Sequence, residues 1–385
     1  MRQKDHSITP AVVRARVMEP LRAAFDWQPR RAVSVDQLLQ LLLLAATAGA
    51  SLFHVVSRFF PFSHDSARRA VSDNCSSVAA VAAGLNRSLQ QVFRWLRPPR
   101  GARWYLAIDT HFVPYYGQRT AAVVGGPRKA GTKYFFGYAT AMVVDRHRRY
   151  TVALEALSPQ ARPYEIVRRL LDRVAECGLT IHGVTADSWF DSGDTLRLLQ
   201  QRRLDYAIPL RRKGRGSNAR NRLFERPTDT VHTATWKTEV GARPVTTAVY
   251  VCRRSARQGR RGAPMVIAYA AWSHGLPLSS TRSRGRQARQ LYRARFGIET
   301  SYRQKNQARA ATTSRDPAYR LLLEGLAHLI RQVWVLLTEQ LARHTRPRPG
   351  DLGAKLRLAT LVRWLDDTLR NGLTELRSIP LRHRT

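Results

Sequence analysis

Two aspartates end short apolar stretches of the sequence. Asp109 closes the run WYLAID, and Asp187 closes the run IHGVTAD. Both runs read as strands, and the ends of strands are where an open α/β sheet presents its functional groups. A carboxylate in such a place must be held by a basic neighbour, by hydrogen bonds or by a metal ion. Two of them at neighbouring strand ends could form one site, although each aspartate taken alone is also typical of a turn or a helix N-cap.

A third carboxylate lies in the segment QLYRARFGIETSYRQKNQ. Tyr292, Arg295 and Glu299 stand at positions i, i+3 and i+7, which predicts that all three project from one side of a helix. This polar stripe favours a helix whose face points into a functional site. The alternative is a solvated helix on which Arg295 and Glu299 form an i, i+4 ion pair.

The charge balance of the chain indicates a polyanionic partner. The 385 residues include 65 Lys and Arg against 27 Asp and Glu, which gives a formal net charge of +38. Neutralising phosphates releases condensed counterions and favours binding, so nucleic acid is the expected ligand. A hydrophobic content of 44% is ordinary for a globular protein with a core, which excludes a disordered basic tail.

Cysteine usage and hydropathy favour a cytoplasmic protein that associates with the nucleoid when it binds DNA. The three cysteines, Cys75, Cys177 and Cys252, form no CxxC pair, so neither a disulfide framework nor a zinc site is expected. The most apolar stretch, from Leu38 to Ala46, is shorter than the ~18 to 20 residues of a membrane span, so no membrane partner is expected. Neither a Walker A loop nor GxGxxG occurs, so we expect no nucleotide cofactor.

The N-terminal part of the chain, residues 1–100, shows helical periodicity and predicts an all-α domain that binds DNA. Within it, residues 51–72 read as a short helix, a turn, and a second helix with Ser63 as its N-cap. This pattern predicts a helix-turn-helix with Arg68 and Arg69 as DNA contacts. A helical hairpin with an exposed basic face fits the same residues.

From Trp104 onward the pattern changes to strands, in the order β-β-β-α-β-α-β, which predicts a mixed α/β layer. We expect residues 101–210 to form the first part of this core, and residues 276–345 to form the second part with the Glu-bearing helix. Residues 211–275 contain two basic runs separated by β-type stretches, which predicts a β-rich basic insertion. Residues 346–385 are expected to form a C-terminal helical tail.

The order of these residues resembles the DDE transposases of prokaryotic insertion sequences, in particular the IS-four-like group with its Y-R-E-K type DDE domain. The segments AIDTHFVPYYG, KAGTKYFFGYAT and RARFGIETSYR each look like family blocks, and the likeness covers about residues 103 to 340. The resemblance implies a ribonuclease H-like catalytic core, in which a mixed β-sheet is flanked by helices. It maps Asp109, Asp187 and Glu299 onto the catalytic triad.

The resemblance also implies a function, the cleavage of transposon ends and strand transfer into target DNA. Such chemistry needs an activated water or 3′-hydroxyl and a stabilised leaving oxygen, which two divalent ions supply. Carboxylates suit Mg²⁺ or Mn²⁺, so Asp109 would bridge both ions while Asp187 and Glu299 each hold one. The expected partner is double-stranded DNA, comprising the terminal inverted repeats and the target, bound by a homodimer.

Two alternatives to this function stay open at the level of sequence. A non-catalytic DNA-binding protein derived from such an element would use the same basic surface. A ribonuclease H-like nuclease would cut DNA without strand transfer. Mg²⁺-dependent nicking separates the first alternative from a transposase, and joining of the 3′-hydroxyl product to a target separates the second.

Further DNA contacts are expected beside the glutamate. By the resemblance, Tyr292 and Arg295 contact the DNA backbone near the scissile phosphate, since the planar fork of arginine suits phosphate. The family lysine usually stands seven residues after the glutamate, where this chain has Asn306. Lys305 lies one residue earlier, about 100° round a helix, and Arg303 is a rival for the same role.

The insertion is expected to supply additional contacts to DNA. Its first basic run, RRKGRGSNARNR, includes Arg211, Arg212 and Lys213, and clusters of like charge at this density repel one another unless an anion is bound. Trp236 lies in an alternating strand, which favours core packing over a contact with a splayed base.

Overall fold

The chain divides into two compact units in the computed structural model. Unit 1 comprises Met1–Pro98, Val113–Phe136 and Ser301–Thr385, and unit 2 comprises Pro99–Phe112 and Gly137–Thr300. The structure describes residues 7–97, 101–145, 148–212, 219–225, 230–240, 243–254, 265–272, 282–345, 356–371 and 373. The predicted change of structure near residue 100 therefore coincides with a unit boundary.

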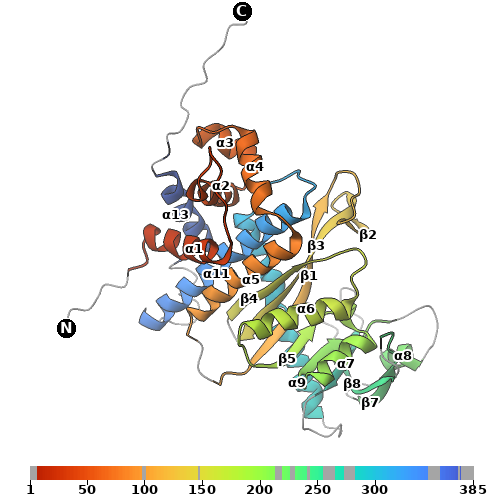
Figure 1. Ribbon diagram of the computed structural model, residues 1–385. Coiled ribbons are helices and arrows are strands. Elements are labelled where there is room, and N and C mark those ends of the chain that lie inside the picture. The colour runs from red at the N-terminus through yellow and green to blue at the C-terminus, as the bar shows by residue number, and fades with distance from the viewer. Residues whose placement is uncertain are drawn as a thin grey trace, which may run out of the picture. The chain divides into compact units, whose positions relative to one another are not determined.

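Helices make up the N-terminal part of unit 1 (Figure 1). They are α1 (Pro10–Ala24), α2 (Val35–Thr47), α3 (Leu52–Phe59), α4 (His64–Asn74) and α5 (Val78–Arg94). Each begins after a serine or threonine whose side-chain oxygen accepts a backbone N–H, which satisfies one donor that a helix start leaves open. The cap of α4 is Ser63, so both helices predicted within residues 51–72 are confirmed.

The long helix α11 (Pro317–Thr345) forms the core of unit 1. It packs along α5, and the side-chain amide of Gln332 donates to the carbonyl of Leu89 at 2.6 Å. The last described helix, α13 (Leu358–Arg370), packs against α1 and α2. By length and composition Pro317–Arg343 could cross a membrane, and so could the α2–α3 pair, which is bent by 117°. Because 83% of the most apolar window of α11 is buried, its apolar character is accounted for by packing.

A mixed sheet runs through unit 2. Its strands are β1 (Trp104–Tyr115), β3 (Thr132–Asp145), β4 (Arg148–Ala156), β5 (Ile181–Ala186), β6 (Asp205–Pro209), β7 (Thr230–Trp236), β8 (Val245–Arg254) and β9 (Met265–Trp272). The strand β2 (Val124–Lys129) pairs with the first residues of β3, and both belong there to unit 1. The order across the sheet is β2-β3-β1-β5-β6-β9-β8-β7, and β4 also pairs with β3.

The pairing directions match a ribonuclease H-like core. β1, β5 and β6 are parallel, whereas β3 and β4 form an antiparallel hairpin. Helices α6 (Pro163–Glu176) and α7 (Gly193–Gln201) follow β4 and β5 and pack side by side against the sheet (Figure 1). The predicted order of elements is confirmed with one strand added, β2, whose Gly-Gly-Pro sequence has no strand pattern.

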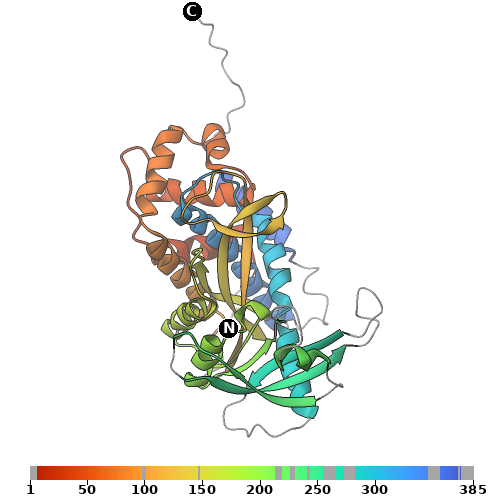
Figure 2. The same ribbon diagram turned by 90° about the vertical axis from the view of Figure 1, so that its right-hand side faces the viewer.

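The strands predicted for a β-rich insertion extend this same sheet. β9 pairs antiparallel with β6, and β8 and β7 continue outward (Figure 2, green to teal). Trp236, at the end of β7, is buried, and its indole N–H donates to Asp191 at 3.0 Å. The predicted packing role of this tryptophan is therefore confirmed. The basic run at 253–262 lies largely outside the described residues.

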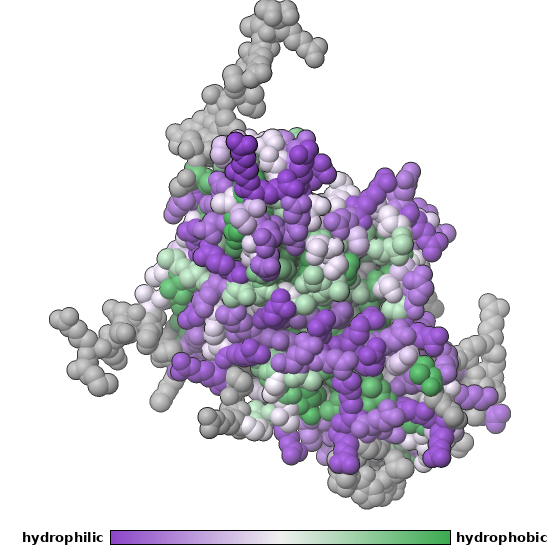
Figure 3. Space-filling view, viewed as in Figure 1, coloured by the Kyte–Doolittle hydropathy of each residue, from purple (hydrophilic) through white to green (hydrophobic). Residues whose placement is uncertain are grey.

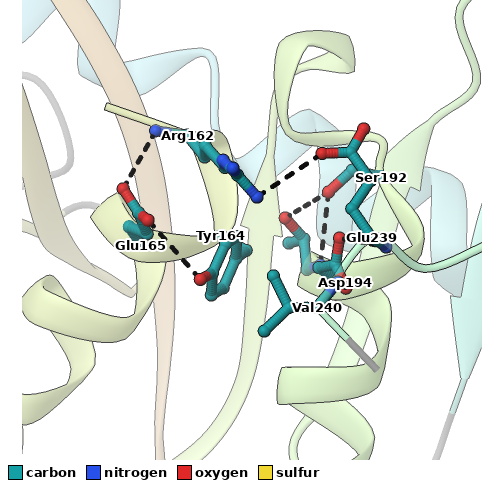
Figure 4. Close-up of polar contacts among 8 residues, drawn as sticks. Arg162, Tyr164, Glu165, Ser192, Asp194, Glu239 and Val240 are labelled. Carbon is teal, nitrogen blue, oxygen red and sulfur yellow. Dashed lines mark hydrogen bonds and ion pairs between the residues drawn. The ribbon is translucent and has the colours of Figure 1, made fainter. Parts of the chain in front are cut away.

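The loop after β7 is anchored to the start of α7 (Figure 4). The carboxylate of Asp194 accepts the backbone N–H of Glu239 at 3.0 Å and that of Val240 at 3.2 Å. The guanidinium of Arg162, which precedes α6, lies 3.6 Å from the Glu239 carboxylate. A Cβ on Gly193 would lie 2.2 Å from the carbonyl oxygen of Lys237, so only glycine allows this approach. The outer strands are thus fixed to the helices of unit 2.

A buried ionic cluster lies in the core of unit 1. Lys305 is fully buried, its Nζ contacts the Glu324 carboxylate, and His328 Nε2 lies 3.6 Å from the same carboxylate. Burial lowers the pKa of Lys305, and Glu324 acts in the opposite direction. The predicted DNA contact of Lys305 is therefore corrected, because a lysine enclosed with a carboxylate cannot reach a phosphate.

We expect Lys305→Met to lower the free energy of unfolding by about 3–5 kcal/mol, because it removes the cation beside a buried carboxylate. Arg303→Met, at an exposed position of the same helix, should change it by less than about 0.5 kcal/mol. In urea unfolding, adding Glu324→Gln to Lys305→Met should recover part of the loss. A stable Lys305→Met variant with weakened DNA binding would restore the original assignment.

Candidate active site

Asp109 lies on β1 in a buried setting. One carboxylate oxygen lies 2.9 Å from Nη1 of the Arg295 guanidinium in an ion pair, and the other accepts the backbone N–H of Thr110 at 2.9 Å. The side chain of Asp109 is 10% exposed and that of Arg295 is 8% exposed. The basic neighbour of this carboxylate is therefore Arg295. The prediction that Asp109 ends its strand is wrong, because β1 continues to Tyr115.

The sheet register places Asp187 beside Asp109. β1 and β5 are parallel, and Ile108 is the partner of Ala186. Each aspartate is the next residue along its strand, so the two acids stand on neighbouring strands at the same level. Asp187 also accepts the backbone N–H of Trp189 at 2.9 Å and caps a short 3₁₀ turn. Asp187 is therefore both the acid at the end of β5 and the cap of this turn, so both interpretations from the sequence are correct.

The helix predicted to carry Tyr292, Arg295 and Glu299 is interrupted. α9 (Arg282–Ala294) ends just before Arg295, and α10 (Gly297–Lys305) begins two residues after it. Arg149 on β4 donates to the carbonyl of Ala294 at 3.1 Å. A Cβ on Gly297 would lie 2.1 Å from Nε of Arg149, so the glycine leaves room for that arginine. The expected single helical face is corrected to two helices with Arg295 at their junction.

Tyr292 and Arg295 are occupied by contacts within unit 2. The Arg295 guanidinium lies 5.4 Å from the centroid of the Tyr292 ring, within cation–π range. Tyr292 also packs against Tyr269, with 5.3 Å between ring centroids, and against an apolar cluster that includes Ala288. Arg295 is therefore paired with the Asp109 carboxylate in this structure. The contacts of Tyr292 and Arg295 with the DNA backbone stay predictions.

The acids influence one another electrostatically. Burial raises the pKa of Asp109 to about 6; the Arg295 cation lowers it, and the Asp187 and Glu299 charges raise it. Burial likewise raises the pKa of Asp187, against the lowering effect of the Trp189 N–H and Arg295. Glu299 is exposed at the start of α10. Three carboxylates near one another disfavour their own ionisation, and a bound cation would relieve this repulsion.

The donor chemistry of this site fits a hard divalent cation, since it consists of carboxylate oxygens with mutual repulsion. Within the described ranges, however, no group of three His, Cys, Asp or Glu side chains is gathered closely enough to hold a metal ion. Arg295 provides the positive charge at Asp109 instead. The side chains that could supply oxygen ligands to a metal are those of Asp109, Asp187 and Glu299.

The remaining predicted DNA contacts are distributed over other elements. Arg303 is exposed on α10, and Arg68 and Arg69 are exposed on α4, where Arg68 lies 3.5 Å from Asp65. Arg211 and Arg212 follow β6 and are exposed, and Arg212 lies 5.0 Å from the Phe224 ring centroid. Lys213 lies outside the described residues.

Two residues that shape the site were not predicted from the sequence. Arg149 fixes the junction of α9 and α10, yet in the stretch RHRRY nothing distinguishes it from its basic neighbours. Asp191 accepts hydrogen bonds from the backbone of Arg211 and from the Trp236 indole, and it joins β6 to β7. Aspartate is common in turns, so the sequence did not indicate that Asp191 bonds to residues so far away along the chain.

The arrangement of strands and helices is that of a ribonuclease H-like fold. The structure is similar to that in "Cryo-EM structure of piggyBac transposase synaptic complex with hairpin DNA", with a TM-score of 0.56, 14% identity, and coverage of 97% of this chain and 82% of that chain. No curated protein matches this chain. The family model described as "Transposase DDE domain" matches residues 100–318, more than half of the chain. The chain belongs to this family and is a DNA transposase, an enzyme of DNA cleavage and strand transfer.

The raised pKa of Asp109 predicts a stability difference that depends on pH. The unfolded chain ionises Asp109 near 3.8 and the folded protein near 6, so the stabilisation is complete below pH 4 and is lost as the pH rises through 6. Relative to Asp109→Asn, the wild-type free energy of unfolding should fall by up to about 3 kcal/mol over this range. Urea unfolding in EDTA measures it, and parallel pH profiles would contradict the prediction.

Proposed function

We propose that Asp109, Asp187 and Glu299 are the catalytic acids of this transposase and hold its divalent cations, two Mg²⁺ or Mn²⁺ ions. The observation that carries the proposal is the register of β1 and β5, which sets two acids side by side on neighbouring interior strands of a mixed sheet. Glu299 supports it, because its charge acts on Asp109. The matched family consists of DDE domains, and such transposases generally use divalent metal ions.

Each side chain has a distinct task in this proposal. Asp109 is deprotonated above about pH 6, and Arg295 fixes the direction of its carboxylate. Asp187 is held by the N–H of Trp189, which donates to one of its carboxylate oxygens. When bound, divalent ions supply an activated water or 3′-hydroxyl and stabilise the leaving oxygen.

The substrate in this proposal is double-stranded DNA, cut at the terminal inverted repeats of the element and joined to a target. The similar piggyBac structure contains hairpin DNA, which supports a DNA substrate for this chain. Exposed arginines on several elements supply phosphate contacts. They are Arg68, Arg69, Arg211, Arg212 and Arg303.

We further propose that the chain belongs to the IS-four-like group, acts as a homodimer on DNA and works in the cytoplasm. The spacing of Tyr292, Arg295 and Glu299 supports the group assignment. The chain departs from the group's pattern at the lysine, because Asn306 occupies that position. The neighbouring Lys305 is buried against Glu324.

We expect Asp109→Asn, Asp187→Asn and Glu299→Gln each to lower DNA cleavage by more than about 100-fold, because losing a ligand exceeds the 10–100-fold effect of an outer-shell change. Binding to end-containing DNA should stay near the wild-type value, since these side chains do not contact phosphate. Cleavage and strand transfer are measured on labelled end duplexes with Mg²⁺.

Asp194→Asn is the matched control, because this aspartate anchors a loop of the outer strands. It should cleave at close to the wild-type rate. Near wild-type cleavage by any of the three acid variants would show that this acid is misassigned. Nicking without joining by the wild-type protein would favour a nuclease, and binding without nicking would favour a non-catalytic DNA-binding protein.

A further inference from the structure

The β2–β3 hairpin is a feature of unit 1 that the active site does not use. Its turn is formed by Ala130 and Gly131, whose φ angles are +50° and +81°. Two consecutive residues in the left-handed region match the tight hairpin turns whose twist suits the flanking strands. The turn therefore joins β2 to β3 directly, and Lys129 pairs with Thr132 across it.

This hairpin and the loop before it are basic. No acidic residue occurs between Asp109 and Asp145. The exposed cationic side chains are Arg119, Arg128, Lys129 and Lys133. Hydrophilic side chains cover the hairpin in Figure 3. Like charges this close together repel one another, and a polyanion relieves the repulsion.

Two tyrosines are exposed on the same hairpin region. Tyr116 is 73% exposed and Tyr134 is 37% exposed. The Tyr116 hydroxyl donates to the carbonyl of Ala130 at 2.8 Å, which ties the loop to the turn. Tyrosine hydroxyls and arginines are among the groups that bind DNA phosphates.

The base of the hairpin is fixed to the core of unit 1. The rings of Tyr115 and Phe136 pack edge to face, with 5.2 Å between centroids. The guanidinium of Arg320 on α11 lies 5.1 Å from the Tyr115 centroid and 4.4 Å from the Phe136 centroid. The Thr132 hydroxyl donates to the carbonyl of Tyr115 at 2.7 Å. The basic surface is therefore carried on a rigid support, which reduces the entropy lost on binding.

We propose that this hairpin is a DNA-binding arm that contacts the phosphate backbone of duplex DNA without reading its sequence. Arg128, Lys129 and Lys133 provide the charge, and Tyr134 provides an exposed ring beside them. Backbone contacts position a protein on DNA, and basic side chains on a short hairpin suit that role. The proposal rests on the function as a DNA transposase, but it is independent of the three acids.

The test is the affinity of Arg128→Gln/Lys129→Gln for end-containing and for random duplexes, measured in EDTA at several salt concentrations. We expect both affinities to fall by the same factor. The slope of log affinity against log salt should become shallower by about 0.9 for each lost phosphate contact. Arg128→Lys/Lys129→Arg keeps both charges and should retain the wild-type slope.

The matched control is Arg357→Gln/Arg363→Gln, which removes two exposed charges at α13 of the same unit. It should change the slope less than the hairpin variant does. An unchanged slope in the hairpin variant, or an equal change in the control, would overturn the proposal. Because EDTA prevents cleavage, this outcome is separate from the test of the acids: wild-type cleavage with normal binding by the hairpin variant would reject the arm alone.

Discussion

The buried ion pair between Arg295 and Asp109 is the interaction on which the active site depends. It joins the junction of α9 and α10 to the strand β1, at a donor–acceptor distance of 2.9 Å. Removing two charges from water is costly, and the mutual attraction offsets that cost only when the geometry is good and other hydrogen bonds complete it. The N–H of Thr110 supplies such a bond. The pair therefore sets where the helix that bears Glu299 begins relative to the acids of the sheet.

The same pair explains how a strongly basic protein keeps a carboxylate at its centre. Burial and the neighbouring acids raise the pKa of Asp109 to about 6, while Arg295 opposes them. The Arg295 cation stabilises the ionised form of this carboxylate. A divalent ion would carry a larger charge to the same oxygens and would compete with Arg295 for them.

Local patterns in the sequence predicted local features, whereas contacts between distant segments could not be predicted. The strand that ends before Asp187 and the cap at Ser63 depend on a few adjacent residues, so their patterns were sufficient. The same pattern ended the first strand at Asp109, whereas β1 continues to Tyr115. The register of β1 with β5 depends on the pairing of segments over 70 residues apart. The inward turn of Arg295 depends on Arg149 beside Gly297, and the burial of Lys305 depends on Glu324. Periodicity assigned Arg295 to a helix face that points into a site and Lys305 to a contact with DNA, but it carries no information on their partners in the folded chain.

If Asp109 and Asp187 hold one metal ion, as proposed, the ion takes the place of Arg295 beside Asp109. Diffraction at the manganese absorption edge, from crystals soaked in Mn²⁺, tests it without any assay of activity. The proposed metal site predicts an anomalous peak about 2.1 Å from carboxylate oxygens of both aspartates. The Arg295 guanidinium should then have moved away from Asp109. Crystals with Mn²⁺ bound elsewhere, no peak at these aspartates and the ion pair intact would contradict it.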